Sequence, residues 1–244
     1  MAGGDITGDC HTLYMKNKIK QMLDTIENEA KYTASYTGRP HFDKRVMQAM
    51  AIVPREKFVP LSIRAFAYDD GALSIGYGQT ISQPYIVALM TDLLDLTPNS
   101  IVLEIGTGSG YQAAILSLLV KQVYTIERVS ELYISAGKLF KELGYNNIQS
   151  RHCNGYYGWH EKAPFDGIIV TAAATHVPPP LIEQLKPGGC MVIPVGMAYS
   201  HQELVRVSKD YNGNTKTEAI LAVSFVPLVI SDKDLEKKTP ENIH

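Results

Sequence analysis

Apolar and polar positions follow two alternating periods along the middle of the chain. Short apolar runs at residues 101–105 and 166–171 are typical of strands buried within a sheet, whereas residues 111–119 and 130–143 have the composition and spacing of helices. Further elements of the same two kinds are predicted at 123–126, 147–151, 180–185 and 189–194. This order of strands and helices predicts an α/β fold built on a doubly wound, mostly parallel sheet.

The segment before this alternation has a different pattern. We predict a helix over residues 12–30, where apolar positions have weak amphipathic spacing, then a loop over 32–40 and a short helix over 43–52 that Pro54 stops. These helices are expected to pack beside the sheet.

The segments on either side of the alternating strands and helices have other patterns. Residues 68–84 are rich in glycine and hydroxyl side chains and predict an ordered loop or broken hairpin, followed by a helix over 83–94 that Ser82 would cap. Near the end of the chain, residues 203–207 and 219–229 predict an antiparallel strand pair.

Length and composition indicate a globular protein with a single main domain. With 244 residues, 45% of them hydrophobic, the chain can bury a large core. We divide it into a partly helical N-terminal extension (1–40), one main domain (41–230) and a polar tail (231–244). The formal net charge of −2 argues against a general attraction to nucleic acid or to an anionic membrane.

Cysteine usage and the absence of targeting patterns favour the cytoplasm. Cys10, Cys153 and Cys190 lack C-x-x-C spacing, so neither a disulfide framework nor a metal site is expected. The first residues lack the basic and apolar regions of a secretory signal, and no run of apolar residues is long enough to cross a membrane. No pattern encodes an oligomeric state, and we favour a monomer.

A glycine-rich loop follows the strand at 101–105. It carries Gly106, Gly108 and Gly110 at alternate positions, and ligands of open α/β sheets bind beyond the carboxyl ends of such strands. The dinucleotide pattern G-x-G-x-x-G is only partly matched, because Tyr111 stands where the third glycine belongs, and the phosphate loop G-x-x-x-x-G-K-[ST] does not occur. Nothing in the loop is arranged for a pyrophosphate.

Two acidic residues narrow the choice of ligand. Glu127 ends the next strand, where a carboxylate can accept the hydroxyls of a ribose. Glu104 stands two residues before the glycines, where an acid suits an ammonium or sulfonium and repels phosphate. S-adenosylmethionine satisfies both carboxylates.

Several alternatives stay open on these residues alone. The glycines are also compatible with a tight strand-to-helix turn that binds nothing, and the fold with an NAD-dependent oxidoreductase or a non-catalytic binding module. A methyltransferase of the same fold acting on a small molecule or nucleic acid would be favoured by N-P-P-[YF] after the strand at 166–171, where this chain has Thr171, Ala172 and Ala173.

Seven short segments between Val53 and Val229 form a recognisable set. They read VPREKFV (53–59), GQTISQP (78–84), VLEIGTGSGY (102–111), APFDGIIVTA (163–172), PGG (187–189), PVG (194–196) and FVPL (225–228). This set resembles the protein-L-isoaspartate O-methyltransferase family, most closely its bacterial form. The glycine loop is shared by many methyltransferases, whereas GQTISQP together with FVPL is specific to this family.

The resemblance implies a fold and an activity. The fold would be the Rossmann-like fold of S-adenosylmethionine-dependent methyltransferases, with N-terminal helices and an antiparallel C-terminal strand pair. The main domain would transfer a methyl group from S-adenosylmethionine, leaving S-adenosyl-L-homocysteine, to the free α-carboxylate of L-isoaspartyl residues in damaged proteins and peptides. In the family the ester collapses to a succinimide, so methylation initiates repair.

The resemblance also implies a set of cofactor contacts. With Glu104 added from the argument above, they are Ser82, Gln83, Tyr85, Glu104, Gly106, Gly108, Ser109, Gly110, Glu127, Arg128, Asn154 and Gly155. Position 154 departs from the family pattern, which usually has an acidic residue there. An amide still offers a carbonyl oxygen to the adenine amino group but lacks the charge.

The chemistry of the acceptor explains why no general base stands out. A carboxylate with a reference pKa of about 3.9 is already ionised at neutral pH, so the protein must align it and remove its water. We expect Ser82 to orient the acceptor by donating its hydroxyl proton, and Thr80 and Ile81 to shape the slot. By resemblance, Val195, Gly196 and Val226 complete the substrate contacts.

Overall fold

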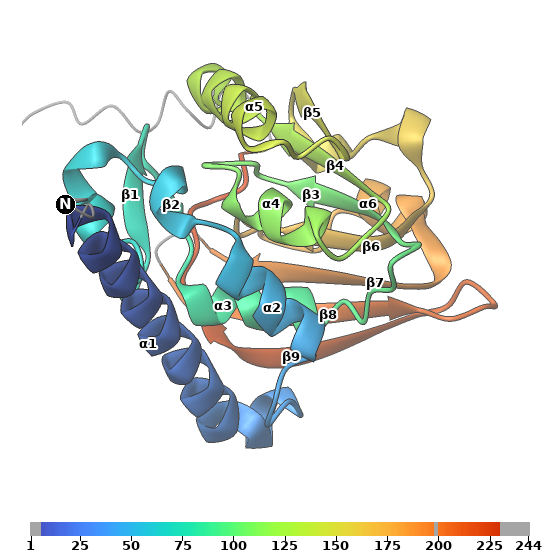
Figure 1. Cartoon of the computed structure of the whole chain (residues 1–244). Helices are drawn as coiled ribbons and strands as arrows, with labels where there is room; N and C mark the ends of the chain where they lie inside the picture. Colours follow the sequence, from blue (N-terminus) through green and yellow to red (C-terminus); the bar gives the residue numbers. More distant parts are fainter. Residues whose placement is uncertain (1–5, 198–199, 230–244) are drawn as a thin grey trace, which may run out of the picture.

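The computed structural model describes residues 6–197 and 200–229, so the predicted polar tail lies outside the described residues. Within this part of the chain, seven strands form one sheet in the order β5-β4-β3-β6-β7-β8-β9, with a separate two-stranded sheet beside it (Figure 1). The strands are β3 (Ile101–Ile105), β4 (Gln122–Glu127), β5 (Ile148–His152), β6 (Phe165–Val170), β7 (Leu185–Gly196), β8 (Gln202–Lys209) and β9 (Thr215–Val223).

Strand direction confirms the predicted fold class. Strands β5, β4, β3, β6 and β7 run parallel, whereas β8 and β9 each pair antiparallel with the strand before them. Strand β3 lies between β4 and β6, the place where the chain's order in the sheet reverses. Because ligands of open α/β sheets bind at such a switch point, beyond the carboxyl ends of the strands, the loop after Ile105 occupies the expected position.

Both faces of the sheet are covered, and alternate strand residues point to opposite sides. Val102 and Val192 belong to one core, which packs against helices α1 to α5; Leu103 and Ile193 belong to the other, which includes α6 and Trp159. The helices are α1 (Ile6–Thr37), α2 (Lys44–Ile52), α3 (Pro84–Asp92), α4 (Tyr111–Ser117), α5 (Ser130–Leu143) and α6 (Pro179–Gln184). Four 3₁₀ turns in the described chain are η1 (Arg55–Phe58), η2 (Leu61–Phe66), η3 (Gly155–Tyr157) and η4 (His160–Lys162).

Helix α1 (Ile6–Thr37) is longer than predicted and replaces most of the loop expected at 32–40. Its buried residues Met22, Ile26 and Ala30 pack in the first core, and Figure 1 shows the helix crossing beside α3. This packing overrides the weak helical pattern of the sequence. The helix ends at Gly38, which has φ +66° and donates its N–H to the carbonyl of Ala34 at 2.9 Å.

The segment before α3 is a hairpin, one of the two forms predicted for it. Strands β1 (Leu73–Gly76) and β2 (Gln79–Ile81) pair antiparallel with an irregularity after Ser74. The expected cap is wrong: α3 begins one residue later, with Gln83 as N-cap and no side-chain capping bond. Pro84 favours the helix start instead, because its fixed φ suits the first helical position and it leaves no unpaired N–H there.

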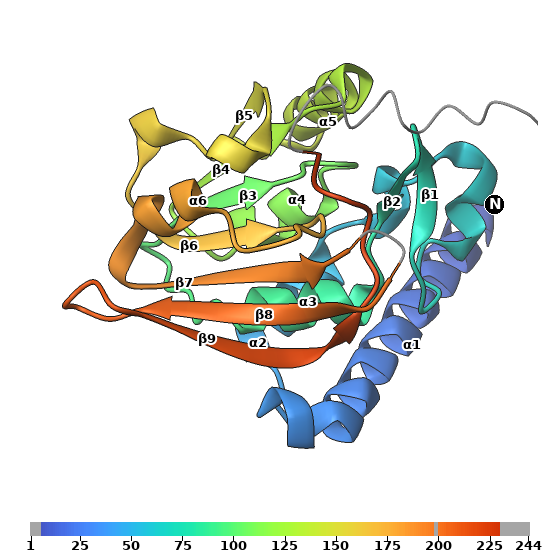
Figure 2. The ribbon, with the colours of Figure 1, turned by 180° about the vertical axis from the view of Figure 1, so that it is seen from behind.

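The last strand ends earlier than predicted. Strand β9 stops at Val223, and residues 224–229 leave the sheet edge and turn back across the carboxyl ends of the parallel strands. Figure 2 shows this segment and the β1–β2 hairpin beside the end towards which β7 points. The side chain of Gln202 holds the turn, accepting the N–H of Phe225 at 2.6 Å and donating to its carbonyl at 3.1 Å.

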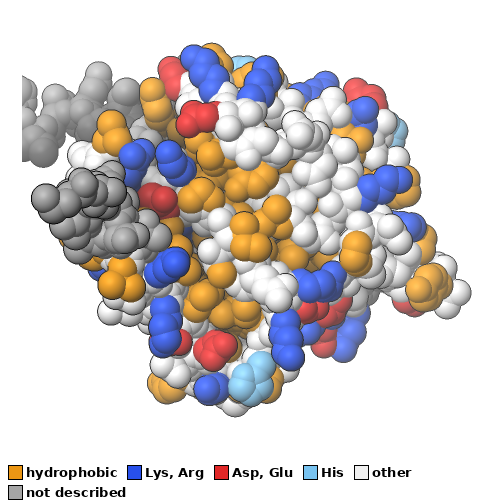
Figure 3. Space-filling model, viewed as in Figure 1, with side chains coloured by type: hydrophobic (Ala, Val, Ile, Leu, Met, Phe, Trp, Pro, Cys, Tyr) orange, Lys and Arg blue, Asp and Glu red, His pale blue; other side chains and the backbone are white. Residues whose placement is uncertain are grey.

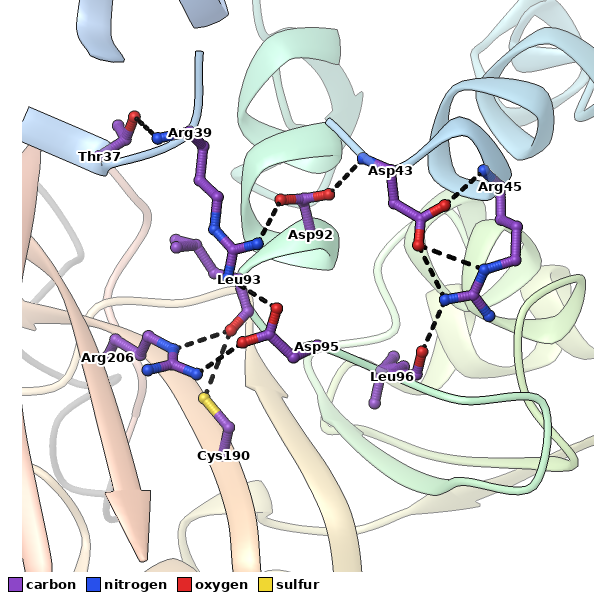
Figure 4. A network of polar contacts seen from close by, with 10 residues as sticks. All are labelled: Thr37, Arg39, Asp43, Arg45, Asp92, Leu93, Asp95, Leu96, Cys190 and Arg206. Atoms are coloured by element: carbon purple, nitrogen blue, oxygen red, sulfur yellow. Dashed lines mark hydrogen bonds and ion pairs between the residues drawn. The ribbon is translucent and has the colours of Figure 1, made fainter. Parts of the chain in front are cut away.

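A polar network ties the opposite end of α3 to the sheet (Figure 4). Asp95 accepts from Arg39, which follows α1, at 2.7 Å and from Arg206 of β8 at 2.8 Å. Arg206 also donates to the carbonyl of Leu93, the C-cap of α3, at 2.9 Å. The network therefore fixes the C-terminal end of the helix whose N-terminal end faces the ligand side of the sheet.

The surface drawn in Figure 3 has Lys and Arg side chains dispersed among Asp and Glu rather than gathered into one patch. Among the helices of the described ranges, none combines the length and apolar character needed to cross a bilayer.

Candidate functional site

A cavity open to solvent lies beyond the carboxyl ends of the central strands; its empty space, with the solvent at its mouth included, is about 870 Å³. Its walls come from the β2–α3 segment, the glycine loop, the end of β4, the start of η3, the end of β6 and the returning C-terminal segment. The lining residues are 79–82, Val87, 105–109, Tyr111, Gln112, 126–129, Asn154, Gly155, Thr171, Ala172 and 226–229.

The β2–α3 segment brings the three predicted acceptor-side residues into this cavity. Thr80, Ile81 and Ser82 all line it. The backbone of Ser82 is held from below, because Nη2 of the buried Arg55 donates to its carbonyl at 2.6 Å. Within the described residues the Ser82 hydroxyl has no hydrogen-bond partner, and it does not cap α3. It is therefore available as a donor to a ligand.

The glycine loop turns sharply from β3 towards α4. Gly106 has φ +95°, and a Cβ atom there would lie 2.5 Å from Oγ1 of Thr171. That hydroxyl donates to the carbonyl of Gly106 at 2.7 Å, so the tip of β6 fixes the loop. Gly106, Gly108 and Ser109 line the cavity as predicted. Gly110 lies behind it, where a Cβ atom would meet the ring of Phe140 at 2.6 Å.

Glu127 joins the end of β4 to this loop. Its Oε2 accepts the N–H of Gly108 at 2.7 Å, and its Oε1 accepts the N–H groups of Arg128 and Val129, both at 2.7 Å. A carboxylate has about four acceptor positions, so these bonds leave about one, on Oε2. The Glu127 carboxylate lines the cavity, and the acceptor position left on its Oε2 lies beside Gly108.

Glu104 is not part of the lining, although the sequence argument placed it against the ligand. Its side chain is fully buried beneath the loop, on the face of the sheet covered by α4. Thr125 donates its hydroxyl to Oε2 of Glu104, and burial together with the charge of Glu127 raises the pKa of Glu104 to about 8. Thr107 completes this network with a 2.6 Å hydroxyl contact to Thr125. Glu104 thus supports the loop from behind.

Asn154 and Gly155 line the cavity at the start of η3. The Asn154 side-chain oxygen accepts the N–H of Tyr156 at 3.0 Å, which caps the turn. A Cβ atom on Gly155 would lie 2.4 Å from Cγ2 of Ile105, so only glycine allows η3 to approach β3 this closely. Asn154 therefore has a structural use of its oxygen in addition to any ligand contact.

The returning C-terminal segment closes one side of the cavity. Ala173 donates its N–H to the carbonyl of Val226 at 2.8 Å and accepts the N–H of Leu228 at 2.7 Å. Residues 226–229 all line the cavity. The predicted substrate residues Val195 and Gly196 do not; they pair with Ala174 at the end of β7 and support this wall from its outer side.

Two further predicted cofactor residues point elsewhere. The Tyr85 side chain is buried against α1, where its hydroxyl lies 2.6 Å from Oγ1 of Thr33. Gln83 donates from Nε2 to Asp70 at 3.0 Å. Neither lines the cavity, whereas Arg128 does and also donates to the carbonyl of Val229 at 3.4 Å.

Sequence reasoning missed several lining residues, notably Gln79, Thr107, Gln112 and Thr171. Thr171 follows a parallel strand directly, which is a usable signal, but its place beside Gly106 depends on β6 pairing with β3. Within the described chain, no group of three or more His, Cys, Asp or Glu side chains is placed to hold a metal ion.

The fold and the site together define a class of protein. A glycine loop after the central strand, a carboxylate at the end of its neighbour and no arrangement for a pyrophosphate fit an adenosine ligand that is not a dinucleotide, seated where Gly106 and Gly155 permit close backbone approach. These are the features of the S-adenosylmethionine-dependent methyltransferases.

Comparison with known proteins identifies the family within this class. Residues 26–233 match the family model described as protein-L-isoaspartate(D-aspartate) O-methyltransferase. The chain belongs to this family.

Named relatives and a solved structure agree with this assignment. The chain is 54% identical over 228 residues to protein-L-isoaspartate O-methyltransferase 2 of Syntrophobacter fumaroxidans, covering 93% of this chain and 92% of the relative. It is 56% identical over 209 residues to the protein of the same name from Nitrosococcus oceani, covering 86% and 95%. A Plasmodium falciparum β-aspartate methyltransferase, solved in complex with S-adenosyl-L-homocysteine, matches with a TM-score of 0.71 and 26% identity over 86% of this chain and 97% of that one.

Proposed function

We propose that the cavity binds S-adenosylmethionine and that the protein methylates the free α-carboxylate of L-isoaspartyl residues in damaged proteins and peptides, which initiates their repair. When bound, S-adenosylmethionine supplies a methyl group on a positively charged sulfur. The observation that carries this proposal is one cavity that joins the glycine loop and Glu127 to the hydroxyl-bearing segment of Thr80 and Ser82, in a chain of this family.

The residues of the cavity divide the work of binding. We assign the ribose to Glu127, the remaining cofactor contacts to Gly106, Gly108 and Ser109, and the adenine to the wall formed by Asn154 and Gly155. These placements are supported by the free acceptor position on Glu127 and by the glycines that bring backbone to the cavity surface.

The acceptor side needs a donor and no base. Among the described lining residues the ionisable side chains are Glu127, Arg128 and Tyr111, and burial raises the pKa of Tyr111 to about 12. A carboxylate acceptor is already ionised at neutral pH, so it needs only to be oriented and desolvated. We assign orientation to the Ser82 hydroxyl, and the surrounding walls to Thr80, Ile81 and Val226.

Direct assay tests this function. The protein is incubated with methyl-labelled S-adenosylmethionine and a pair of peptides that differ only in an isoaspartyl or an ordinary aspartyl residue, and base-labile methyl ester is counted. We expect ester on the isoaspartyl peptide alone. Equal labelling of both peptides contradicts the substrate assignment, and labelling of neither would make the chain a binding module.

We further propose that the protein acts as a monomer in the cytoplasm, without nucleic acid or membrane as a partner. The dispersed charges in Figure 3 support this proposal, as do Cys153 and Cys190, both free thiols in the described part of the chain. Sedimentation with and without an isoaspartyl protein tests the oligomeric state, and a dimer would contradict it.

A further inference from the structure

Arg55 is a fully buried arginine that the cavity lining does not include. It begins the short turn η1 directly after Pro54, and its Nε donates to the carbonyl of Ala67 at 2.7 Å. Its Nη2 donates to the carbonyl of Ser82, and its guanidinium lies over the ring of Tyr111, 4.8 Å from the centroid. One side chain thus contacts Ala67 at the end of η2, the acceptor segment (residues 80–82) and Tyr111, the first residue of α4.

The environment of Arg55 is unusual for a buried cation. Buried charges are normally paired with an opposite charge, because desolvation is expensive. Within the described residues no carboxylate forms an ion pair with Arg55, and its Nη1 has no hydrogen-bond partner. A buried cation that breaks this rule is expected to serve function rather than stability alone.

The two groups that Arg55 joins lie on the two sides of the reaction. Ser82 precedes α3, and its carbonyl is not used by that helix, whose first bond runs from the N–H of Val87 to the carbonyl of Gln83. Tyr111 follows Gly110 and starts the helix that continues the cofactor loop. The hydrogen bond to the Ser82 carbonyl therefore fixes the position of the acceptor segment. The contact with the Tyr111 ring fixes that position relative to the glycine loop that precedes α4.

We propose that Arg55 is a positioning residue for methyl transfer, which fixes the Ser82 backbone and so aims the Ser82 hydroxyl relative to the cofactor loop. This inference rests on the proposed function of Ser82. Misplacing a group that orients the acceptor lowers the rate of the chemical step more than the affinity for the cofactor, so loss of the clamp should act mainly on turnover.

The chain offers a matched control in Arg206. That side chain donates to the carbonyl of Leu93 at 2.9 Å, so it holds the opposite end of the same helix α3, far from the cavity. Arg206→Met removes an arginine–carbonyl clamp, together with the ion pair that Arg206 forms with Asp95, without touching the acceptor segment. It reports how much of any effect comes from destabilising α3.

The experiment compares Arg55→Met, Arg55→Lys, Ser82→Ala and Arg206→Met for turnover of an isoaspartyl peptide, S-adenosyl-L-homocysteine affinity by calorimetry, and Tm. We expect Arg55→Met to lower kcat about 10-fold, no more than Ser82→Ala does, and Arg55→Lys about threefold, because an ammonium keeps a donor but has no planar fork to hold both carbonyls. The affinity for S-adenosyl-L-homocysteine should change less than about threefold in both Arg55 variants. Arg206→Met should lower Tm and leave kcat within about twofold.

The double variant Arg55→Met with Ser82→Ala separates positioning from a general structural effect. If Arg55 acts through Ser82, the double variant should be as slow as Ser82→Ala alone, because coupled residues are non-additive. Multiplying effects, wild-type kcat in Arg55→Met, or an equal loss in Arg206→Met would overturn the inference. Ser82→Ala with wild-type turnover would instead overturn the role given to Ser82, and an inactive wild-type protein would overturn the proposed function.

Discussion

The carboxylate of Glu127 accepts the backbone N–H of Gly108 at 2.7 Å, so the end of β4 and the glycine loop after β3 are joined before any ligand binds. The same carboxylate holds the two amides that follow it in the chain. The loop is thus preorganised around the acceptor oxygen to which we assign the ribose, and less ordering has to occur on binding.

Replacing Glu127 by glutamine tests this arrangement. The amide oxygen can replace only one carboxylate oxygen, and its NH₂ group faces backbone donors. Because hydrogen bonds to charged groups are worth about 1.5–3 kcal/mol, S-adenosyl-L-homocysteine should bind about 10- to 100-fold more weakly by calorimetry. Glu131→Gln, on the exposed first turn of α5, is the control and should bind normally. Normal binding by Glu127→Gln would remove the ribose assignment.

Ser82→Ala should separate turnover from cofactor binding. The hydroxyl lines the cavity without another partner among the described residues, so its loss should lower kcat by about 10-fold or more, which corresponds to a hydrogen bond of about 1.5 kcal/mol. Affinity for S-adenosyl-L-homocysteine should stay within about twofold. Ser74→Ala, exposed on the same hairpin, is the matched control. A weaker Kd with unchanged kcat would contradict the acceptor role.

The buried Glu104 predicts a pH dependence of stability. Its pKa is raised in the folded protein from 4.5 to about 8, so the folded state favours the protonated form. The stability that this provides is complete below about pH 4.5 and is lost as the pH rises towards 8. Glu104→Gln cannot ionise, so its Tm relative to wild type should rise between pH 5 and pH 8.5. Parallel Tm curves for the two proteins would contradict the raised pKa.

Gly110 and Gly144 have similar backbone angles, but we predict that replacing each by alanine lowers the free energy of unfolding by different amounts. Gly110 has φ +91° and Gly144 has φ +78°, but a Cβ atom at 110 meets Phe140 at 2.6 Å whereas nothing lies within 4 Å at 144. Gly144→Ala should cost about 1–2 kcal/mol from backbone strain alone. Gly110→Ala should cost about 1–3 kcal/mol more from overpacking, measured by urea unfolding. Equal costs would mean that Phe140 moves aside freely.

Asn154→Asp should strengthen cofactor binding. Aspartate can keep the cap on the Tyr156 N–H while offering a charged acceptor to the adenine amino group. Charge-assisted hydrogen bonds are about twice as strong as neutral ones, so a gain of about fivefold in S-adenosyl-L-homocysteine affinity is expected. Asn146→Asp, in an exposed turn, controls for added charge. Unchanged or weaker binding would place the adenine away from position 154.

The central sheet could be predicted because its signals are local. Strand β3 and helix α5 have the predicted bounds, since a β-branched run and an amphipathic repeat each end at a clear loop. Helix α1 and the end of β9 could not be predicted in the same way. Their limits depend on packing against α3 and on the side chain of Gln202, contacts between residues distant in the sequence.

The same contrast between local signals and distant contacts holds for the residues of the candidate site. The loop from Gly106 to Ser109, Glu127 and the segment from Thr80 to Ser82 carry their chemistry in adjacent residues and line the cavity as predicted, whereas Gly110 lies behind it. Tyr85 and Glu104 carry plausible side chains at plausible positions, but helix geometry turns one towards α1 and strand alternation turns the other beneath α4. Arg55 gives no local signal of its role, because its partners come from three separate segments.

The most direct measurement is a crystal structure of the protein with S-adenosyl-L-homocysteine and an isoaspartyl peptide. We predict the ribose on Glu127, the sulfur facing the segment around Ser82, and the Ser82 hydroxyl bonded to the acceptor carboxylate. A nucleoside bound elsewhere, or a Ser82 hydroxyl turned away from the sulfur, would contradict the mechanism.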